Sequence, residues 1–188
     1  MQAPEYSQLA LEPFSDAPAK TWQWRKVQAA KRTFALRSDD TLLAGLRFEK
    51  ASGSLATADT AQGRLSFKRT GVFKVRMTLW RAGTAEELGV FTPKWHDWGG
   101  GLELAGGRRF SWRGVSMWST GFEWASEDGT VLLRLEHSSK SKTEADVTLT
   151  PEGLAEPELP LLVTFGYYLL VLMADEMVAI AGVAGAGG

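Results

Sequence analysis

An uncharged run near the C-terminal end constrains the fold more than any other feature of this chain. The sixteen residues from Leu159 to Ala174 carry no charge, and Asp175 and Glu176 follow directly. Wound as a helix, Leu161 to Met173 is apolar on every side. A helix of this kind belongs inside a protein core or inside a membrane, because it has no polar face for water.

The chain before this run is typical of short β-strands. Apolar and polar residues alternate with a period of two, which places the apolar ones on one face of each strand. Turn signals such as Asp128-Gly129 separate these segments at short intervals. We therefore expect about twelve strands between residues 6 and 150. The longest alternations predict two shared faces, formed by Phe73, Val75, Met77 and Leu79 and by Leu42, Ala44, Leu46 and Phe48.

The strands suggest where the helix is buried. A barrel of about twelve strands is too wide for its own side chains to fill, since about eight already leave an interior that is just filled. A membrane span needs about 20 apolar residues, which is more than this run supplies before its two acids. We predict one domain, residues 1–188, as a closed antiparallel β-barrel around a helix at about 158–181. Attachment to a membrane by this helix is the alternative. The helix residues expected in the core are Leu161, Leu162, Phe165, Leu169 and Leu172.

Charge is unevenly distributed along the chain. Residues 1–122 contain 18 Lys and Arg against 11 Asp and Glu, whereas residues 123–188 contain 3 against 11. In two stretches, 20–37 and 64–81, every charged residue is basic, and side by side these strands would form a surface for anionic headgroups or phosphates. Solvated strand faces are the simpler interpretation. The candidate ligand-binding residues are Lys68, Arg69, Lys74 and Arg76.

Catalytic and metal-binding patterns are absent from the sequence. The chain has no Cys and two His, His96 and His137, without the spacing of a zinc site. The segment Glu127–Gly129 is typical of a hairpin turn, with Ca²⁺ ligation as a weaker alternative. We therefore expect no catalytic residues, no cofactor and no metal. With no secretory signal at its start, the chain is expected in the cytoplasm, with peripheral attachment to a membrane as an option.

Two further groups of residues have open interpretations. Asp175 and Glu176 are either solvated where the helix leaves the barrel or form a buried proton or ion site with a raised pKa. The eight tryptophans are expected mainly in the core, because large aromatic rings fill a barrel efficiently. Four of them have no clear phase and are candidates for the rim or for a binding surface: Trp80, Trp95, Trp98 and Trp118.

The order of these segments resembles a known superfamily. The matching pieces are Phe34–Arg37, Gly106–Arg113, Phe122–Trp124 before Asp128-Gly129, and the helix Leu159–Ile180. The chain resembles the tubby C-terminal-like superfamily, which includes tubby proteins, phospholipid scramblases and the plant LURP-one-related proteins. The resemblance implies a barrel of about a dozen strands around a buried helix. It implies phosphoinositide binding in the tubby branch, but no tubby lipid-binding position is carried over to this chain.

Two classes of function follow. The first is a non-enzymatic binding domain that recognises anionic phospholipid headgroups through basic strands. The second is a structural or regulatory domain whose partner is another protein. No nucleic-acid partner is expected.

Overall fold

The computed structural model describes residues 10–17, 21–28, 30–71, 74–94, 98–115, 121–138 and 144–185. A short 3-10 helix, η2 (Phe14–Asp16), precedes the strands, and the helices α1 (Pro151–Leu154) and α2 (Leu159–Gly185) follow them. The twelve strands of the described residues are β1 (Trp22–Lys26), β2 (Thr33–Ser38), β3 (Thr41–Phe48), β4 (Ala56–Thr60), β5 (Gly63–Thr70), β6 (Arg76–Arg81), β7 (Glu87–Pro93), β8 (Gly100–Leu104), β9 (Arg109–Gly114), β10 (Gly121–Ser126), β11 (Val131–His137) and β12 (Ala145–Leu149).

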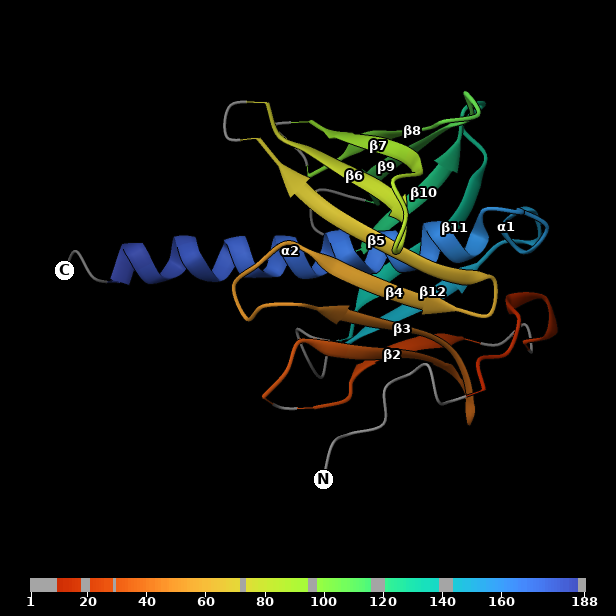
Figure 1. Ribbon diagram of the computed structural model, residues 1–188, viewed down its shortest axis with the longest axis horizontal. Helices are drawn as coiled ribbons and strands as arrows, with labels where there is room; N and C mark the ends of the chain where they lie inside the picture. The colour runs from red at the N-terminus through yellow and green to blue at the C-terminus, as the bar shows by residue number, and fades with distance from the viewer. Residues whose placement is uncertain are drawn as a thin grey trace.

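The strands form a closed barrel, which confirms the predicted architecture. Each strand pairs antiparallel with the next along the chain, and β1 closes the barrel by pairing with β12. In this closing pair Trp22 lies opposite Val147 and Trp24 lies opposite Ala145. Helix α2 runs through the barrel and continues beyond one of its ends (Figure 1).

The alternation on β3 differs from the predicted one at a single position. Leu36 of β2 lies opposite Ala44, but Arg37 lies opposite Leu42, so Leu43 is an extra residue in β3. This bulge turns Leu43 into the barrel core and leaves Leu42 in a separate small cluster with Ala35. The prediction that Leu42 shares a face with Ala44 was therefore wrong. Phe73, which was predicted to share a strand face with Val75, Met77 and Leu79, lies outside the described residues.

The barrel interior is filled by α2. The five predicted core residues of the helix are all buried, with exposures between 0% for Leu162 and 8% for Leu172. The Phe165 ring lies 5.2 Å from the Phe67 ring and 5.6 Å from the Phe91 ring, centroid to centroid. These contacts are edge-to-face, the geometry that aromatic pairs prefer. The aromatic residues of the strands thus surround the helix.

A glycine in α2 permits the closest approach between helix and barrel. A Cβ at Gly166 would lie 2.8 Å from Nε1 of Trp124 and 3.1 Å from Trp112. Both tryptophans are buried, and their rings lie 5.0 Å apart, centroid to centroid. The missing side chain therefore makes the space in which two indole rings pack against the helix.

The connection from β12 to α2 ends one strand and begins the helix within a few residues. Thr150 caps α1, since its hydroxyl accepts a hydrogen bond from the Gly153 N–H at 3.0 Å. Glu156 then accepts a hydrogen bond from the Glu158 N–H at 3.0 Å, directly before α2 begins. Pro160 lies in the first turn of α2, where a backbone N–H would have no partner within the helix.

The helix leaves the barrel after Met173. Met173 is still buried, Ala174 is intermediate, and Met177 and Val178 are exposed. The helical backbone continues to Gly185, four residues beyond the predicted end. One continuous helix therefore has a buried segment, Leu159–Met173, and a projecting segment, residues 174–185.

Candidate functional site

The basic residues chosen from sequence fall on different faces of the barrel. Lys68, Lys74 and Arg76 are exposed, whereas Arg69 is half-buried. Arg69 lies opposite Met77 in the β5–β6 pair, on the same side as the buried Phe67. Its side chain therefore faces the barrel interior near α2. The four residues do not form one outward patch.

The two basic stretches are also apart in the barrel. The first contributes β1 and β2, the second contributes β5 and β6, and strands β3 and β4 lie between them. The continuous basic wall expected from side-by-side strands is therefore not formed. The two stretches meet instead at one end of the barrel, through the connections that follow β1 and β5.

The topology sorts the connections into two groups. In an up-and-down barrel, alternate connections lie at opposite ends, because each strand reverses the direction of the one before. The connections after β1, β3, β5, β7, β9 and β11 lie at the end from which α2 projects, which we name the exit end. The connections after the other six strands lie at the opposite end, where α2 begins, which we name the entry end.

The connections at the two ends carry opposite net charge, and the exit end also holds Asp175 and Glu176 of α2, each paired with an arginine. The described residues in the connections at the exit end include five basic residues and two acidic ones, which are Lys31, Arg32, Lys50, Lys74 and Lys94 and then Glu49 and Glu144. Those at the entry end include one basic residue and eight acidic ones, which are Arg108 and then Asp39, Asp40, Glu86, Glu127, Asp128, Glu152, Glu156 and Glu158. The uneven distribution of charge along the sequence thus places basic connections at the exit end of the barrel and acidic connections at the entry end.

The exposed apolar side chains follow the same polarity. Of the five large hydrophobic side chains exposed in the described part of the chain, four lie at the exit end: Val27 (51% exposed), Trp98 (41%), Met177 (50%) and Val178 (64%). The fifth, Leu154 (40%), lies at the entry end. Isolated exposed apolar residues are ordinary, but their concentration beside lysines distinguishes the exit end from the rest of the surface.

An arginine at the exit end holds the helix where it leaves the barrel. Arg32 forms an ion pair with Asp175 and donates hydrogen bonds to the carbonyls of Gly53 at 2.8 Å and Ala51 at 3.3 Å. Its guanidinium also lies 3.8 Å from the centre of the Phe48 ring. Burial lowers the pKa of Arg32 and raises the pKa of Asp175, the latter against the opposing effect of the Arg32 charge.

A second contact holds the other side of the helix. Arg69 forms an ion pair with Glu176, and the Tyr168 hydroxyl donates to the Ser54 carbonyl at 2.8 Å. Asp175 and Glu176 are therefore at the mouth of the barrel, as one of the two sequence interpretations had it, but each has an arginine partner. Four exposed lysines, Lys31, Lys50, Lys74 and Lys94, lie in connections at the same end of the barrel.

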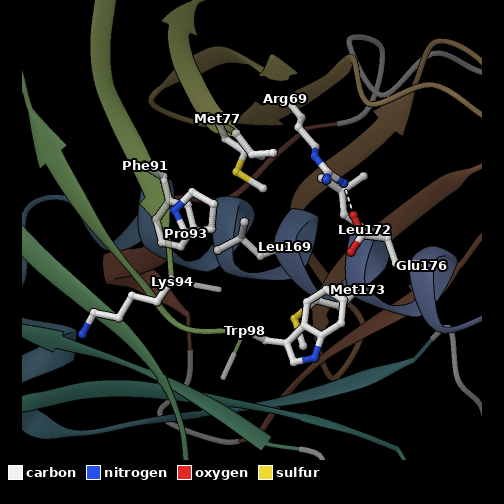
Figure 2. A pocket seen from close by; sticks show the side chains of 11 residues that line it. Arg69, Met77, Phe91, Pro93, Lys94, Trp98, Leu169, Leu172, Met173 and Glu176 are labelled. Atoms are coloured by element: carbon white, nitrogen blue, oxygen red, sulfur yellow. Dashed lines mark hydrogen bonds and ion pairs between the residues drawn. The ribbon is translucent and has the colours of Figure 1, made fainter. Parts of the chain in front are cut away.

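A pocket of about 300 Å³ opens beside the helix at this end. Its floor consists of buried apolar side chains of β6, β7 and α2, and its rim carries Arg69, Lys94, Glu176 and Trp98 (Figure 2). The floor residues are Met77, Phe91, Leu169, Leu172 and Met173. In Figure 2 the Trp98 indole lies beside Met173, and Arg69 reaches across to Glu176.

Trp98 has a strained backbone. Its φ is 56°, a left-handed conformation that is rare for a bulky residue. Strain of this kind costs about 1–3 kcal/mol and is found preferentially at binding and active sites. The sequence indicated Trp98 as a rim candidate only through its unclear phase. Trp80 is half-exposed on β6, and Trp95 and Trp118 lie outside the described residues.

Other candidate sites give no second cluster. Gly129 has a φ of 88° in the β10–β11 turn, and Asp128 accepts hydrogen bonds there from Ser126 and Thr130, so the hairpin interpretation of this segment is confirmed. His96 lies outside the described residues, and burial lowers the pKa of His137. Within the described ranges, no three His, Cys, Asp or Glu residues are grouped closely enough to hold a metal ion.

Sequence reasoning missed Lys31, Lys50 and Lys94 as members of a common surface. They come from three separate connections, and each is unremarkable by itself. The sequence nevertheless contained this information. In an up-and-down barrel alternate connections lie at the same end, and the three lysines lie in such alternate connections.

Comparison with family models, with curated proteins and with solved structures finds no match for this chain. The resemblance to the tubby-like superfamily therefore remains a prediction.

Proposed function

We propose that this protein is a non-enzymatic domain that binds the surface of an anionic phospholipid membrane through the exit end of the barrel. The observation that supports it is the coincidence, at one end only, of exposed lysines with exposed apolar side chains. The ligand is the anionic headgroup expected from sequence. The contact surface is the exit end of the barrel, whereas the sequence had suggested the wall formed by β5 and β6.

The charges favour this orientation. A basic side chain near an anionic membrane contributes about 1 kcal/mol of attraction. Lys31, Lys50, Lys74 and Lys94 project from four different connections around the helix, so they can approach a flat surface together. The acidic entry end would be repelled by the same surface. The polarity of the barrel therefore favours a single orientation with the projecting segment toward the lipid.

The projecting segment suits shallow insertion. At about 1.5 Å per residue, residues 174–185 extend by about 18 Å, which is less than the roughly 30 Å of hydrocarbon in a bilayer. By length and composition Leu159–Ala179 could cross a membrane, a weak indication because buried core helices meet the same criterion. Its first fifteen residues fill the barrel, so only the projecting segment is available to the lipid. Trp98 at the rim suits the interface, where tryptophan is enriched.

Vesicle co-sedimentation tests this proposal. Vesicles of equal parts phosphatidylglycerol and phosphatidylcholine should bind the protein at low salt, and pure phosphatidylcholine vesicles should bind it weakly. Binding should weaken as salt screens the lysines. Val178→Glu should reduce binding about tenfold or more, since burying a valine side chain contributes about 1.5–3 kcal/mol.

Matched substitutions locate the contact. Leu154→Glu places the same charge on an exposed apolar position at the entry end and should leave binding unchanged. Lys31→Glu with Lys94→Glu should abolish binding, whereas Lys68→Glu with Arg76→Glu on the barrel wall should reduce it less. Equal binding to both vesicle types, or equal loss from the end and wall pairs, would contradict the proposal. If the wild-type protein binds no vesicles, a protein partner becomes the favoured explanation.

A further inference from the structure

The pocket at the exit end has an apolar floor and a charged rim. The buried side chains of its floor are hydrocarbon, aromatic or thioether groups, with no group that requires a hydrogen bond. Met77 and Met173 contribute flexible, polarizable side chains that adapt to irregular occupants. An occupant of this floor must therefore be apolar.

The rim provides a cation for a polar end of that occupant. Arg69 lies at the rim with Glu176 as its carboxylate partner in the described part of the chain, whereas the Lys94 side chain extends away from the pocket (Figure 2). An arginine has five N–H donors in a fixed fork, so one ion pair leaves donors available to an anionic group. The pocket is apolar at its floor and charged at its rim, which matches a molecule with an apolar tail and an anionic head.

The volume limits the occupant to a single chain. A pocket of about 300 Å³ lies at the lower end of the range for small-molecule sites, about 300–1,000 Å³. Two chains of a phospholipid would exceed it, whereas part of one chain would fit along the helix. The strained backbone of Trp98 beside Met173 is a further mark of a binding site.

We infer that this pocket binds one acyl chain of an anionic amphiphile, with the chain against Leu169 and Met173 and the anionic head at Arg69. The inference rests on the proposed membrane function for the source of the chain, since the pocket opens at the end that faces the lipid. The same chemistry is offered by a bilayer phospholipid and by a free fatty acid.

A fluorescent fatty acid tests the inference without vesicles. The emission of cis-parinaric acid rises when its chain enters an apolar site, so titration below its micelle concentration should give a saturable increase with one site per protein. Met173→Trp fills the pocket and should weaken binding about tenfold or more, the loss expected when several methylene groups stay in water. Val75→Trp at the half-buried rim provides a second obstruction in case the first variant does not fold.

Controls separate the pocket from non-specific binding. Thr148→Trp adds the same side chain at an exposed position of β12 and should not change the titration. Arg69→Gln removes the cation at the rim and should weaken binding of the fatty acid. Oleate should displace the probe more strongly than oleyl alcohol, which has the same chain without charge. Displacement by lysophosphatidylglycerol as well would indicate that a phospholipid head is accepted, and displacement by oleate alone would indicate a fatty-acid site.

The outcomes distinguish this inference from the membrane proposal. Saturable probe binding that Met173→Trp removes, in a protein that does not bind vesicles, would support the pocket and contradict the membrane function. Vesicle binding with no probe binding would overturn the pocket alone. Equal titrations for the wild type, a folded Met173→Trp variant and a folded Val75→Trp variant would also overturn it.

Discussion

The buried and projecting segments of α2 are both rich in apolar residues but differ in side-chain size. The buried segment contains Phe165, Tyr167 and Tyr168 together with several leucines, whereas the residues after Glu176 are Met, Val, Ile, Ala and Gly. The large side chains pack against the aromatic residues of the strands, whereas Met177, Val178 and Ala179 are exposed. Apolar character therefore makes the helix available for burial, but side-chain volume and the pair Asp175-Glu176 determine where burial ends.

The largest expected effect comes from placing the same charge in both segments. Leu162→Asp buries an unpaired carboxylate at a fully buried position and should cost more than about 4 kcal/mol, enough to prevent folding. Met177→Asp adds the charge at an exposed position and should change the free energy of unfolding by less than about 0.5 kcal/mol. Circular dichroism shows whether Leu162→Asp folds at all, and urea unfolding measures the free energy of unfolding of Met177→Asp. Similar losses in the two variants would mean that the projecting segment is packed in solution.

Exchanging glycine and alanine in the two segments gives the next largest effect. Helix propensity alone would favour the alanine in both segments, but we expect the buried segment to disfavour it. Gly166→Ala should gain about 1 kcal/mol from propensity alone, but its Cβ would lie 2.8 Å from Trp124 Nε1. Overpacking typically costs about 1–3 kcal/mol, so we expect net destabilisation. Ala179→Gly in the exposed projecting segment should cost about 1 kcal/mol, as in an isolated helix. Thermal unfolding compares the two, and a stabilised Gly166→Ala protein would refute the tight contact.

The boundary between the segments should contribute little to stability. Glu176→Gln removes the ion pair with Arg69, and both side chains are about one-third exposed (35% each). Partly solvated pairs contribute about 0–1 kcal/mol, so the loss should be within that range and should shrink at high salt. We expect the amide hydrogens of the projecting segment to exchange faster in Glu176→Gln, while the free energy of global unfolding decreases little. Unchanged exchange would show that the pair does not hold the helix.

The smallest effect is a pH dependence at Asp175. Burial raises the pKa of Asp175 in the folded protein, so the folded state binds a proton more tightly than the unfolded chain. Relative to Asp175→Asn, the wild type should therefore lose stability as the pH rises from the unfolded value, 3.8, through the raised folded pKa. Above that pKa the difference should be constant. Arg32 keeps its carbonyl partners in the variant, so the folded state should persist. Unfolding measured at several pH values checks the sign.

The sequence predicted the barrel and the buried helix because both depend on short-range patterns. Alternation along the strands specifies inward faces, and a helix such as Leu161–Met173 with no polar face requires a core. The strand number followed from the same alternation, together with turns such as Asp128-Gly129. These features do not depend on which side chains contact one another in the core.

Register and depth were not predictable in the same way. The bulge at Leu43 depends on how β3 pairs with β2, and the alternation within β3 carries no trace of it. The inward direction of Arg69 looks unfavourable in isolation and becomes acceptable only because Glu176 arrives from a segment 107 residues away. The candidate site was therefore only partly predicted: its chemistry was anticipated from the basic residues, and its place at one end of the barrel was not.

The order of the elements along the chain has a consequence for synthesis. The barrel closes between β1 and β12, where Gln23 bonds to Asp146 across 123 residues, and its filling arrives last, as α2. The strands leave the ribosome before the helix that fills the barrel. Until then, the side chains of Trp22, Trp24 and their neighbours have no core to pack into. Contacts this distant in sequence slow folding. We expect the nascent chain to depend on chaperones until the buried segment of α2, Leu159–Met173, has emerged.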